Sequence, residues 1–360
     1  MRFVMFVHSL VSDWDNDDAD FQRGVVSELQ ARGHEVSVFE PSNGWSRTNL
    51  LRAHPTAFEA WYRAFPTLSS TTYETATIDL DAILQDADVV LVHDWNDHGL
   101  IRRLGAHRAA GAGFRLLFHD TCHRPASEIE TGSGADLRGY DGVLACTDLI
   151  RDLYVRRGFP ERAWTWHKAA DVRVFKPMSG LPRTEDAVWT SDGSDDQITE
   201  IRDYVAEPTR IMKLRVAAYG GPLAESAVTT LTAAGVRQVG WVPSFELAEH
   251  LVRTACVIDT PSRTRVTALP GLPSTRLLEA MACGTPVISA PWADTDGLVS
   301  AGEDHLVARS GEQMRAHLRA VLHDAALARE LGARGRAKIL AQHTCAHRVS
   351  ALLSIHAKLV

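Results

Sequence analysis

The segment LPSTRLLEAMACGTPVISAPW, residues 272–292, shows most directly which fold the chain adopts. Ser274 or Thr275 is placed to cap a helix, and Gly284 is the residue type that most often ends one. Pro286 then opens a short apolar run, which we interpret as a buried strand. The segment therefore predicts a helix followed directly by a strand, as in the repeating unit of α/β proteins.

The same alternation of apolar runs and helical stretches recurs along the whole chain. Apolar runs predict strands at residues 2–7, 35–39, 88–92, 114–118, 142–146, 187–190, 214–219, 236–239, 255–259, 286–289 and 305–308. Apolar residues at helical spacing predict helices at 19–32, 97–110, 148–157, 195–206, 222–234, 244–253, 274–283, 310–340 and 345–359. Buried strands that alternate with helices indicate parallel sheets.

The length and one irregular stretch together predict two domains. At about 150 residues per domain, 360 residues suffice for two. Residues 171–186 contain two prolines and little periodicity, so they predict a linker. We therefore expect Rossmann-like domains at 1–175 and 176–340, followed by a closing helix at 341–360. Two such sheets that face a central cleft would bind ligands in the loops after their strands.

The composition excludes some broad functions. Asp and Glu number 45 against 38 Lys and Arg, a net charge of −7, so we expect no generic binding of nucleic acid. No stretch approaches the ~20 apolar residues of a membrane span. The first apolar run lacks a cleavage site, which favours a buried strand over a signal peptide. The five cysteines form no CxxC pair and predict reduced thiols in a cytoplasmic protein.

The start of the helix in 272–292 has the chemistry of an anion site. Free backbone N–H groups and the helix dipole attract negative charge there, and Arg276 adds a planar guanidinium suited to phosphate. Glu279, one turn further on, is able to accept hydrogen bonds from a ribose diol. A capped amphipathic helix with solvated Arg276 and Glu279 explains the same residues equally well.

This segment resembles the donor-site helix of group 1 (family 4-like) glycosyltransferases. It looks most like their spore-maturation-protein (CgeB-like) branch, in which a P-x-R-x-x-E-A-x-A-C-G-x-P pattern recurs. The likeness extends to residues 239–243, 269–273, 297–298 and 304–309. It also covers the layout of two domains and a last helix, so it spans most of the chain.

The resemblance implies a GT-B fold, in which the last helix crosses back to the N-terminal domain. It implies transfer of a sugar from a UDP-, GDP- or TDP-linked donor to an acceptor, whether a small molecule, a glycan or a protein. For such a bacterial-type enzyme we expect no metal site and no cofactor, because arginines and helix dipoles stabilise the departing diphosphate. By analogy with group 1 enzymes, we expect the transfer to retain the anomeric configuration of the sugar.

The position of each residue in the motif assigns the donor contacts. The resemblance implies that Glu279 holds the ribose and that Arg276, with the helix start, holds the diphosphate. Trp241 and Val242 would flank the base. The other expected donor contacts are Gly220, Gly221, Arg263, Ser274 and Thr275. The two glycines would allow close backbone approach, although a plain strand-to-helix turn explains them as well.

Two departures from the family pattern concern charge. Family 4 enzymes commonly carry a first glutamate eight residues before the ribose-binding one, and Gly271 stands there. They also usually carry an Arg/Lys pair near the start of the donor domain, whereas residues 185–200 contain six acids and no Lys or Arg. We therefore expect Arg276, with Arg263 or Arg265, to neutralise the diphosphate.

His119 and Asp120 follow a predicted strand in the N-terminal half. Group 1 enzymes often have a His-Asp at this place, with the histidine near the reacting sugar. His119 would then donate to the donor's hydroxyls or diphosphate, and Asp120 would orient its ring. The alternative is a buried structural histidine, which is the interpretation we prefer for the similar His93-Asp94.

The loop of residues 8–18 faces the predicted cleft and carries four aspartates. Asp13 is a candidate base beside Asp120, although acids before a helix also simply favour its dipole. The residues that we expect to contact the acceptor are His8, Trp14 and Asn16.

Two rival functions fit the same sequence. Another GT-B enzyme, such as a nucleotide-sugar epimerase, would cleave the same donor without a second substrate. A non-catalytic GT-B nucleotide-binding protein would explain the acids of 185–200 and the missing first glutamate.

Overall fold

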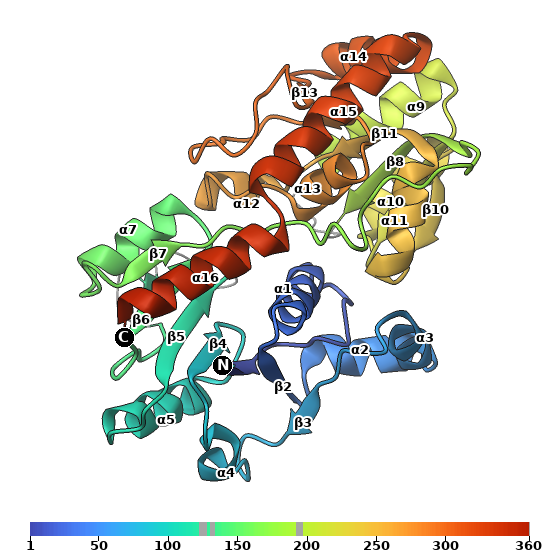
Figure 1. Ribbon diagram of the computed structural model, residues 1–360. Coiled ribbons are helices and arrows are strands. Elements are labelled where there is room, and N and C mark those ends of the chain that lie inside the picture. The colour runs from blue at the N-terminus through green and yellow to red at the C-terminus, as the bar shows by residue number, and fades with distance from the viewer. Residues whose placement is uncertain (122–127, 130–133, 192–196, 360) are drawn as a thin grey trace. The chain divides into compact units, whose positions relative to one another are not determined.

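The chain is described here from a computed structural model over residues 1–121, 128–129, 134–191 and 197–359, without the side chains of Thr264 and Arg265 (Figure 1). It forms two compact units: Met1–Lys168 with Cys345–Val360, and Ala169–Thr344. The predicted ranges 1–175, 176–340 and 341–360 divide the chain a few residues away from these bounds. Each unit is an α/β structure with its own sheet.

The first unit contains a seven-stranded parallel sheet in the order β3-β2-β1-β4-β5-β6-β7. Phe3 of β1 pairs with Val36 of β2 on one side and with Val89 of β4 on the other. The strand order therefore reverses between β1 and β4, which is where ligands bind in sheets of this type. The strands are β1 (Arg2–Phe6), β2 (Glu35–Pro41), β3 (Thr71–Tyr73), β4 (Val89–His93), β5 (Arg115–Asp120), β6 (Gly142–Ala145) and β7 (Ala163–Thr165).

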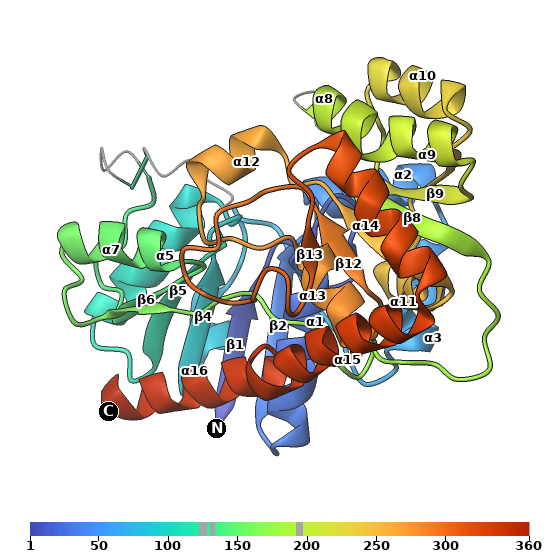
Figure 2. The same ribbon diagram turned by 90° about the horizontal axis from the view of Figure 1, so that it is seen from above.

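The helices of the first unit include the last helix of the chain. They are α1 (Ala19–Ala31), α2 (Trp45–Ala53), α3 (Ala57–Ala64), α4 (Leu80–Leu84), α5 (His98–Ala109), α7 (Asp148–Arg156) and α16 (Cys345–Leu359). Helix α16 lies beside α1 (Figures 1 and 2), and Arg32 donates to Ser350 Oγ at 3.0 Å and to the Ala346 carbonyl at 2.9 Å. Trp166 Nε1 donates to the Arg348 carbonyl at 2.8 Å. The predicted return of the last helix to the N-terminal domain is confirmed.

The second unit contains a six-stranded parallel sheet in the order β10-β9-β8-β11-β12-β13. Its strands are β8 (Glu185–Ser191), β9 (Val216–Gly220), β10 (Arg237–Gly240), β11 (Thr254–Asp259), β12 (Val287–Ser289) and β13 (Leu306–Val307). Its helices are α8 (Ile198–Glu200), the π-helical η2 (Ile201–Ala206), α9 (Glu207–Met212), α10 (Glu225–Ala233), α11 (Ser244–Val252), α12 (Arg263–Ala268), α13 (Thr275–Ala282), α14 (Gly311–His323) and α15 (Ala325–Gln342).

The core of the second unit lies on both faces of its sheet. Successive side chains of a strand point to opposite faces, so Val188 and Val257 belong to one apolar cluster while Trp189 and Ile258 belong to the other. This double burial explains why the central residues of β8 and β11 are apolar. The predicted parallel α/β architecture is therefore confirmed for both units.

The structure corrects several sequence predictions. The expected helix 310–340 is two helices, because Asp324 ends α14 and its carboxylate accepts from the Ala326 and Leu327 amides at 2.9 and 3.0 Å. Elements that were not predicted are α2, α3, β3, α4, β7, α9 and α12. Cys256, Cys283 and Cys345 are free, but Cys146 is disulfide-bonded, so the expectation of reduced thiols throughout was wrong. Cys122 lies outside the described residues.

A membrane-crossing helix is absent from the described part of the chain, where every helix is too short or too polar to span a bilayer.

Two glycines allow α15 to approach the end of α13. Gly284, just after α13, has φ +74, a conformation that favours glycine. A Cβ on Gly332 of α15 would lie 2.1 Å from the Gly284 carbonyl oxygen. Gly284 therefore ends α13, and its carbonyl group lies directly against the backbone of α15.

We predict that Gly332→Ala destabilises the second unit by about 2 kcal/mol, because a methyl group has no space between the two backbones. Urea unfolding measures the change. Gly113→Ala is the control, since no described atom lies within 4 Å of its added Cβ. Equal stability of the two variants would contradict the predicted close contact.

Candidate functional site

The candidate donor residues lie at the carboxyl edge of the second sheet. Neighbouring strands β11 and β12 are followed by the connections 260–274 and 290–305, and the Ala290 amide donates to the Asp259 carbonyl at 2.8 Å. Helix α13 begins where the first of these connections ends. Most of the residues assigned by the motif are therefore brought to one edge of one sheet.

The start of α13 differs in one respect from the prediction. Ser274 occupies the N-cap position with extended backbone angles, φ −62° and ψ 136°, but its side chain makes no capping hydrogen bond within the described structure. Ser274 therefore occupies the predicted N-cap position, without the hydrogen bond that a capping side chain makes. Backbone N–H groups of a first turn that lack a side-chain acceptor suit an anion.

Glu279 and Arg276 form an ion pair on α13. The Glu279 side chain is only 1% exposed, and its Oε2 accepts a hydrogen bond from the Arg276 guanidinium. A carboxylate this deeply buried needs a charged partner, because its desolvation is costly. The alternative of a solvated glutamate was therefore wrong, and Arg276 serves Glu279 in this structure.

Arg263 is engaged in the same way. It lies at the start of α12, and its Nε donates to Glu200 Oε1. Glu200 belongs to the acidic stretch that lacks Lys and Arg in sequence, and its side chain is mostly buried. Arg276 and Arg263, which we expected to bind a diphosphate, are thus each paired with a carboxylate. The side chain of Arg265, the third candidate, lies outside the described part of the structure.

The remaining donor candidates lie after β9 and β10. Gly220 ends β9 with φ +141°, and Gly221 has open space where a Cβ would stand, with no described atom within 4 Å. Trp241 and Val242 follow β10, and Val242 packs against the apolar cluster that also contains Leu277 of α13. Val242 is therefore connected to α13 through the core.

The departure at Gly271 has a structural cause. Its φ is +88°, and a Cβ there would lie 2.6 Å from Asp296 Oδ1 and 2.7 Å from Thr295 Oγ1. The positive φ favours glycine at this position, whereas the two nearby oxygens are the ends of side chains that are able to move. Sequence reasoning missed Asp296, which no motif singled out.

His119 lies at the carboxyl end of β5 in the first unit and is almost fully buried. Its ring packs edge-on against Trp166 at 4.7 Å and against His93 at 5.0 Å, while its Nδ1 is 3.4 Å from Gln22 Nε2. Burial lowers the pKa of His119 to about 3, with the nearby Lys168 charge contributing. The imidazole is therefore neutral at physiological pH.

Two carboxyl groups lie beside His119 at the ends of β4 and β5. Asp120 accepts a 2.6 Å hydrogen bond from the Tyr154 hydroxyl. Asp94 accepts from the Thr121 amide and hydroxyl at 3.1 and 2.8 Å. Burial, with the neighbouring Asp120 and Asp18 charges, raises the pKa of Asp94 well above its usual range. Asp94 therefore holds Thr121, the residue that follows His119 and Asp120, in place.

The β1–α1 loop is held by buried charges. The Arg23 guanidinium, 1% exposed, donates to Asp13 at 3.0 Å and to the Leu10 and Val11 carbonyls at 2.8 Å. Asp13, predicted as a base, is thus a partner of a buried arginine. Sequence reasoning missed Arg23 because helical spacing alone does not show which polar residue turns inward.

The predicted acceptor residues of this loop have different surroundings. The Asn16 side chain donates to the Ser9 and Ser12 carbonyls at 3.3 and 3.0 Å, which stabilises the loop itself. His8 stacks on Trp95 at 4.5 Å, and Trp14 contacts the ring of His54. Of the three acceptor candidates, Trp14 is the most exposed.

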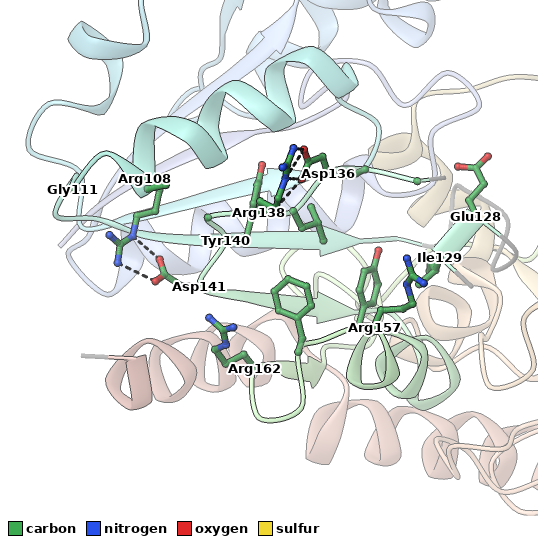
Figure 3. A pocket seen from close by; sticks show the side chains of 17 residues that line it. Arg108, Gly111, Glu128, Ile129, Asp136, Arg138, Tyr140, Asp141, Arg157 and Arg162 are labelled. Carbon is green, nitrogen blue, oxygen red and sulfur yellow. Dashed lines mark hydrogen bonds and ion pairs between the residues drawn. The ribbon is translucent and has the colours of Figure 1, made fainter. Parts of the chain in front are cut away.

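A separate cavity of about 870 Å³ lies in the first unit near the starts of β5, β6 and β7 (Figure 3). Arg108 donates to both carboxylate oxygens of Asp141 at 2.8 and 3.0 Å. Arg138 pairs with Asp136 in the same way. The predicted site residues are not among its lining residues, so this cavity is distinct from the candidate site.

Two glycosyltransferase family models match the chain, one in each half. Residues 20–165 match a model described as "Glycosyl transferase 4-like domain", and residues 200–354 match one described as "Glycosyl transferase-like". A comparison with curated proteins gives no match.

Solved structures of the same architecture align over nearly the whole chain. Sucrose-phosphate synthase from Thermosynechococcus elongatus has 17% identity and a TM-score of 0.63, covering 100% of this chain and 99% of that one. HepE of Anabaena in complex with UDP and glucose has 12% identity and a TM-score of 0.67, covering 99% and 100%. An α-glucosyltransferase in complex with UDP and DNA has 12% identity and a TM-score of 0.69, covering 99% of each chain.

The two parallel sheets with flanking helices and these structural matches define the GT-B class. With a glycosyltransferase model matching part of each half, the chain is an enzyme of glycosyl transfer.

We predict that the ring of His119 keeps its neutral NMR chemical shifts from pH 8 down to pH 5, because its folded-state pKa is about 3. The unfolded chain takes up a proton near pH 6.5, so the free energy of unfolding falls by about 2 kcal/mol from pH 6.5 to pH 5. His119→Gln assigns the resonances and removes this part of the pH dependence. A titration midpoint above pH 5.5 would contradict the predicted burial.

Proposed function

We propose that this glycosyltransferase moves a sugar from a UDP-, GDP- or TDP-linked donor to an acceptor, without a metal and with retention of configuration. UDP is the first nucleotide to test, because HepE and the α-glucosyltransferase are described in complex with it. The sequence pattern alone supports a place in the CgeB-like branch. The cytoplasm stays the predicted compartment.

The observation that carries this proposal is the buried Glu279 at the second turn of α13, held by Arg276. A fully buried carboxylate is costly to keep, so its place beside the start of a helix indicates a binding role. Glu279 would accept hydrogen bonds from the ribose hydroxyls of the donor. Trp241 and Val242 would flank the base on the loop after β10.

The diphosphate would bind the backbone at the start of α13, at Ser274 and Thr275, rather than a cluster of free cations. Arg276 and Arg263 are engaged with carboxylates, so each supplies only part of its charge. The backbone at Gly220 and Gly221 would approach the phosphates closely. Backbone dipoles of this kind stabilise charge on a leaving group without reorganisation.

His119 and Asp120 are the residues that we propose for the reacting centre. The neutral imidazole of His119 would donate a hydrogen bond to the sugar or the phosphate, and Asp120 with Tyr154 would fix the end of β5. We assign Asp13 to loop positioning with Arg23 instead of to proton abstraction.

Trp14, supported by His8 and Asn16, would contact the acceptor. The α-glucosyltransferase neighbour is described with DNA, but a net charge of −7 argues against a DNA acceptor for this chain. A small molecule, a glycan or a protein is the proposed class.

We predict that Glu279→Gln raises the Kd for UDP about tenfold, because a neutral amide makes a weaker hydrogen bond to a ribose hydroxyl. Titration calorimetry measures this with UDP, GDP and TDP. Glu249→Gln is the matched control, since Glu249 forms a surface pair with Arg253 at 2.8 Å in the same unit. Unchanged affinity in Glu279→Gln would place the nucleotide elsewhere.

We also predict that release of UDP from UDP-glucose, measured directly by chromatographic separation of the two nucleotides, persists unchanged in excess EDTA. Arginine and backbone dipoles would then suffice to stabilise the leaving diphosphate. Full loss of turnover in EDTA, with recovery on adding Mg²⁺, would contradict the metal-independent mechanism. Label exchange at a sugar carbon without UDP release would identify an epimerase.

A further inference from the structure

The cavity of about 870 Å³ in the first unit, which is distinct from the candidate site, is lined by four arginines (Figure 3). Two of them are neutralised within the cavity wall. Arg108 donates to both carboxylate oxygens of Asp141 at 2.8 and 3.0 Å. Arg138 pairs with Asp136 at 2.6 Å. A cavity of this volume is in the range of sites that bind small molecules.

The other two arginines of the wall, Arg157 and Arg162, have guanidinium groups that are available to a ligand. Both side chains are exposed, and neither forms a hydrogen bond or an ion pair with any residue that the structure describes. Glu128, the third acid of the wall, forms no ion pair with either arginine within the same described residues. Cations therefore outnumber acids around this cavity, although the chain as a whole has a net charge of −7.

Both available arginines come from one short connection between α7 and β7. Arg157 is the C-cap residue of α7, and Arg162 directly precedes β7. The Phe159 amide donates to the Tyr154 carbonyl at 3.1 Å, and the Arg162 amide donates to the Phe159 carbonyl at 3.2 Å. The guanidinium carbon of Arg162 lies 5.5 Å from the centroid of the Phe159 ring. A hydrogen-bonded turn thus supplies two positive charges and an aromatic surface to the same cavity.

We infer that this cavity binds a small phosphorylated molecule, with Arg157 and Arg162 as its cationic contacts. Guanidinium groups donate charge-assisted hydrogen bonds to phosphate oxygens and match their geometry. A phosphate dianion supplies the two arginines with the counter-charge that Asp141 and Asp136 supply to the other two. The Phe159 ring gives the rest of the ligand an apolar surface. None of the proposed donor or acceptor residues lines the cavity, so this is a second ligand site.

The test measures the binding of two phosphomonoesters, phenyl phosphate and glucose 6-phosphate, to the full-length chain by titration calorimetry. Phenol and glucose are their unphosphorylated counterparts. We expect the wild-type chain to bind at least one ester and neither counterpart, and the preferred ester shows whether the ligand is aromatic or a sugar. Arg157→Gln and Arg162→Gln should each weaken binding of that ester about tenfold, the effect of losing one charge-assisted hydrogen bond.

Arg156→Gln is the matched control. Arg156 is an exposed arginine at the end of α7 that does not line the cavity. Its substitution removes the same charge from the same region and should change the Kd of the ester by less than about twofold. Thermal melting of all three variants near the wild-type Tm shows that the fold is unchanged.

Three outcomes would overturn the cavity site. The first is a wild-type chain that binds neither ester with a Kd below about 10 mM. The second is unchanged affinity in Arg157→Gln or Arg162→Gln, which is also the result expected if the ester binds only at the start of α13. The third is an equal loss of affinity in Arg156→Gln, which would show a general effect of charge. The proposed glycosyl transfer is unaffected by all three, because it depends on other residues.

Discussion

The pair of Arg276 and Glu279 is the interaction on which the carboxyl edge of the second unit depends. Glu279 is buried at the level of the apolar cluster that contains Leu277 and Leu278. Without its arginine, this carboxylate would have to leave the core or take up a proton. Because both residues lie on α13, the pair neutralises a buried carboxylate within the helix, while Leu277 and Leu278 pack the helix into the core.

Pairing with a cation also accounts for the two acidic stretches, which by themselves would repel an anionic ligand. In the β1–α1 region, Asp13 and Asp20 hold Arg23, while Asp17 and Asp18 hold Lys168. In the second unit the pairs are Glu185–Arg237, Asp186–Arg215 and Glu200–Arg263. The described acids of these pairs therefore meet cations that lie elsewhere in the sequence, whereas Asp192, Asp195 and Asp196 lie outside the described residues.

The sequence predicts the central strands well because β1, β4 and β11 are apolar runs of five or six residues that are almost fully buried. It does not predict α2 to α4, since these helices are short and each buries only one or two side chains. The motif identifies α13 and Glu279 from local spacing alone. The partners of the site residues are not predictable in this way. Lys168 and Asp17 are 151 positions apart, and Arg263 and Glu200 are 63 apart.

The placement of α16 in the first unit has a consequence for how the chain is made. Because Val349, Leu352 and Ile355 are buried there beside α1, the first unit lacks part of its core until these residues have been synthesised. The second unit is contiguous in sequence and contains all its strands by residue 307. During translation the second unit is thus able to finish folding before the first, the reverse of the usual N-terminal-first order.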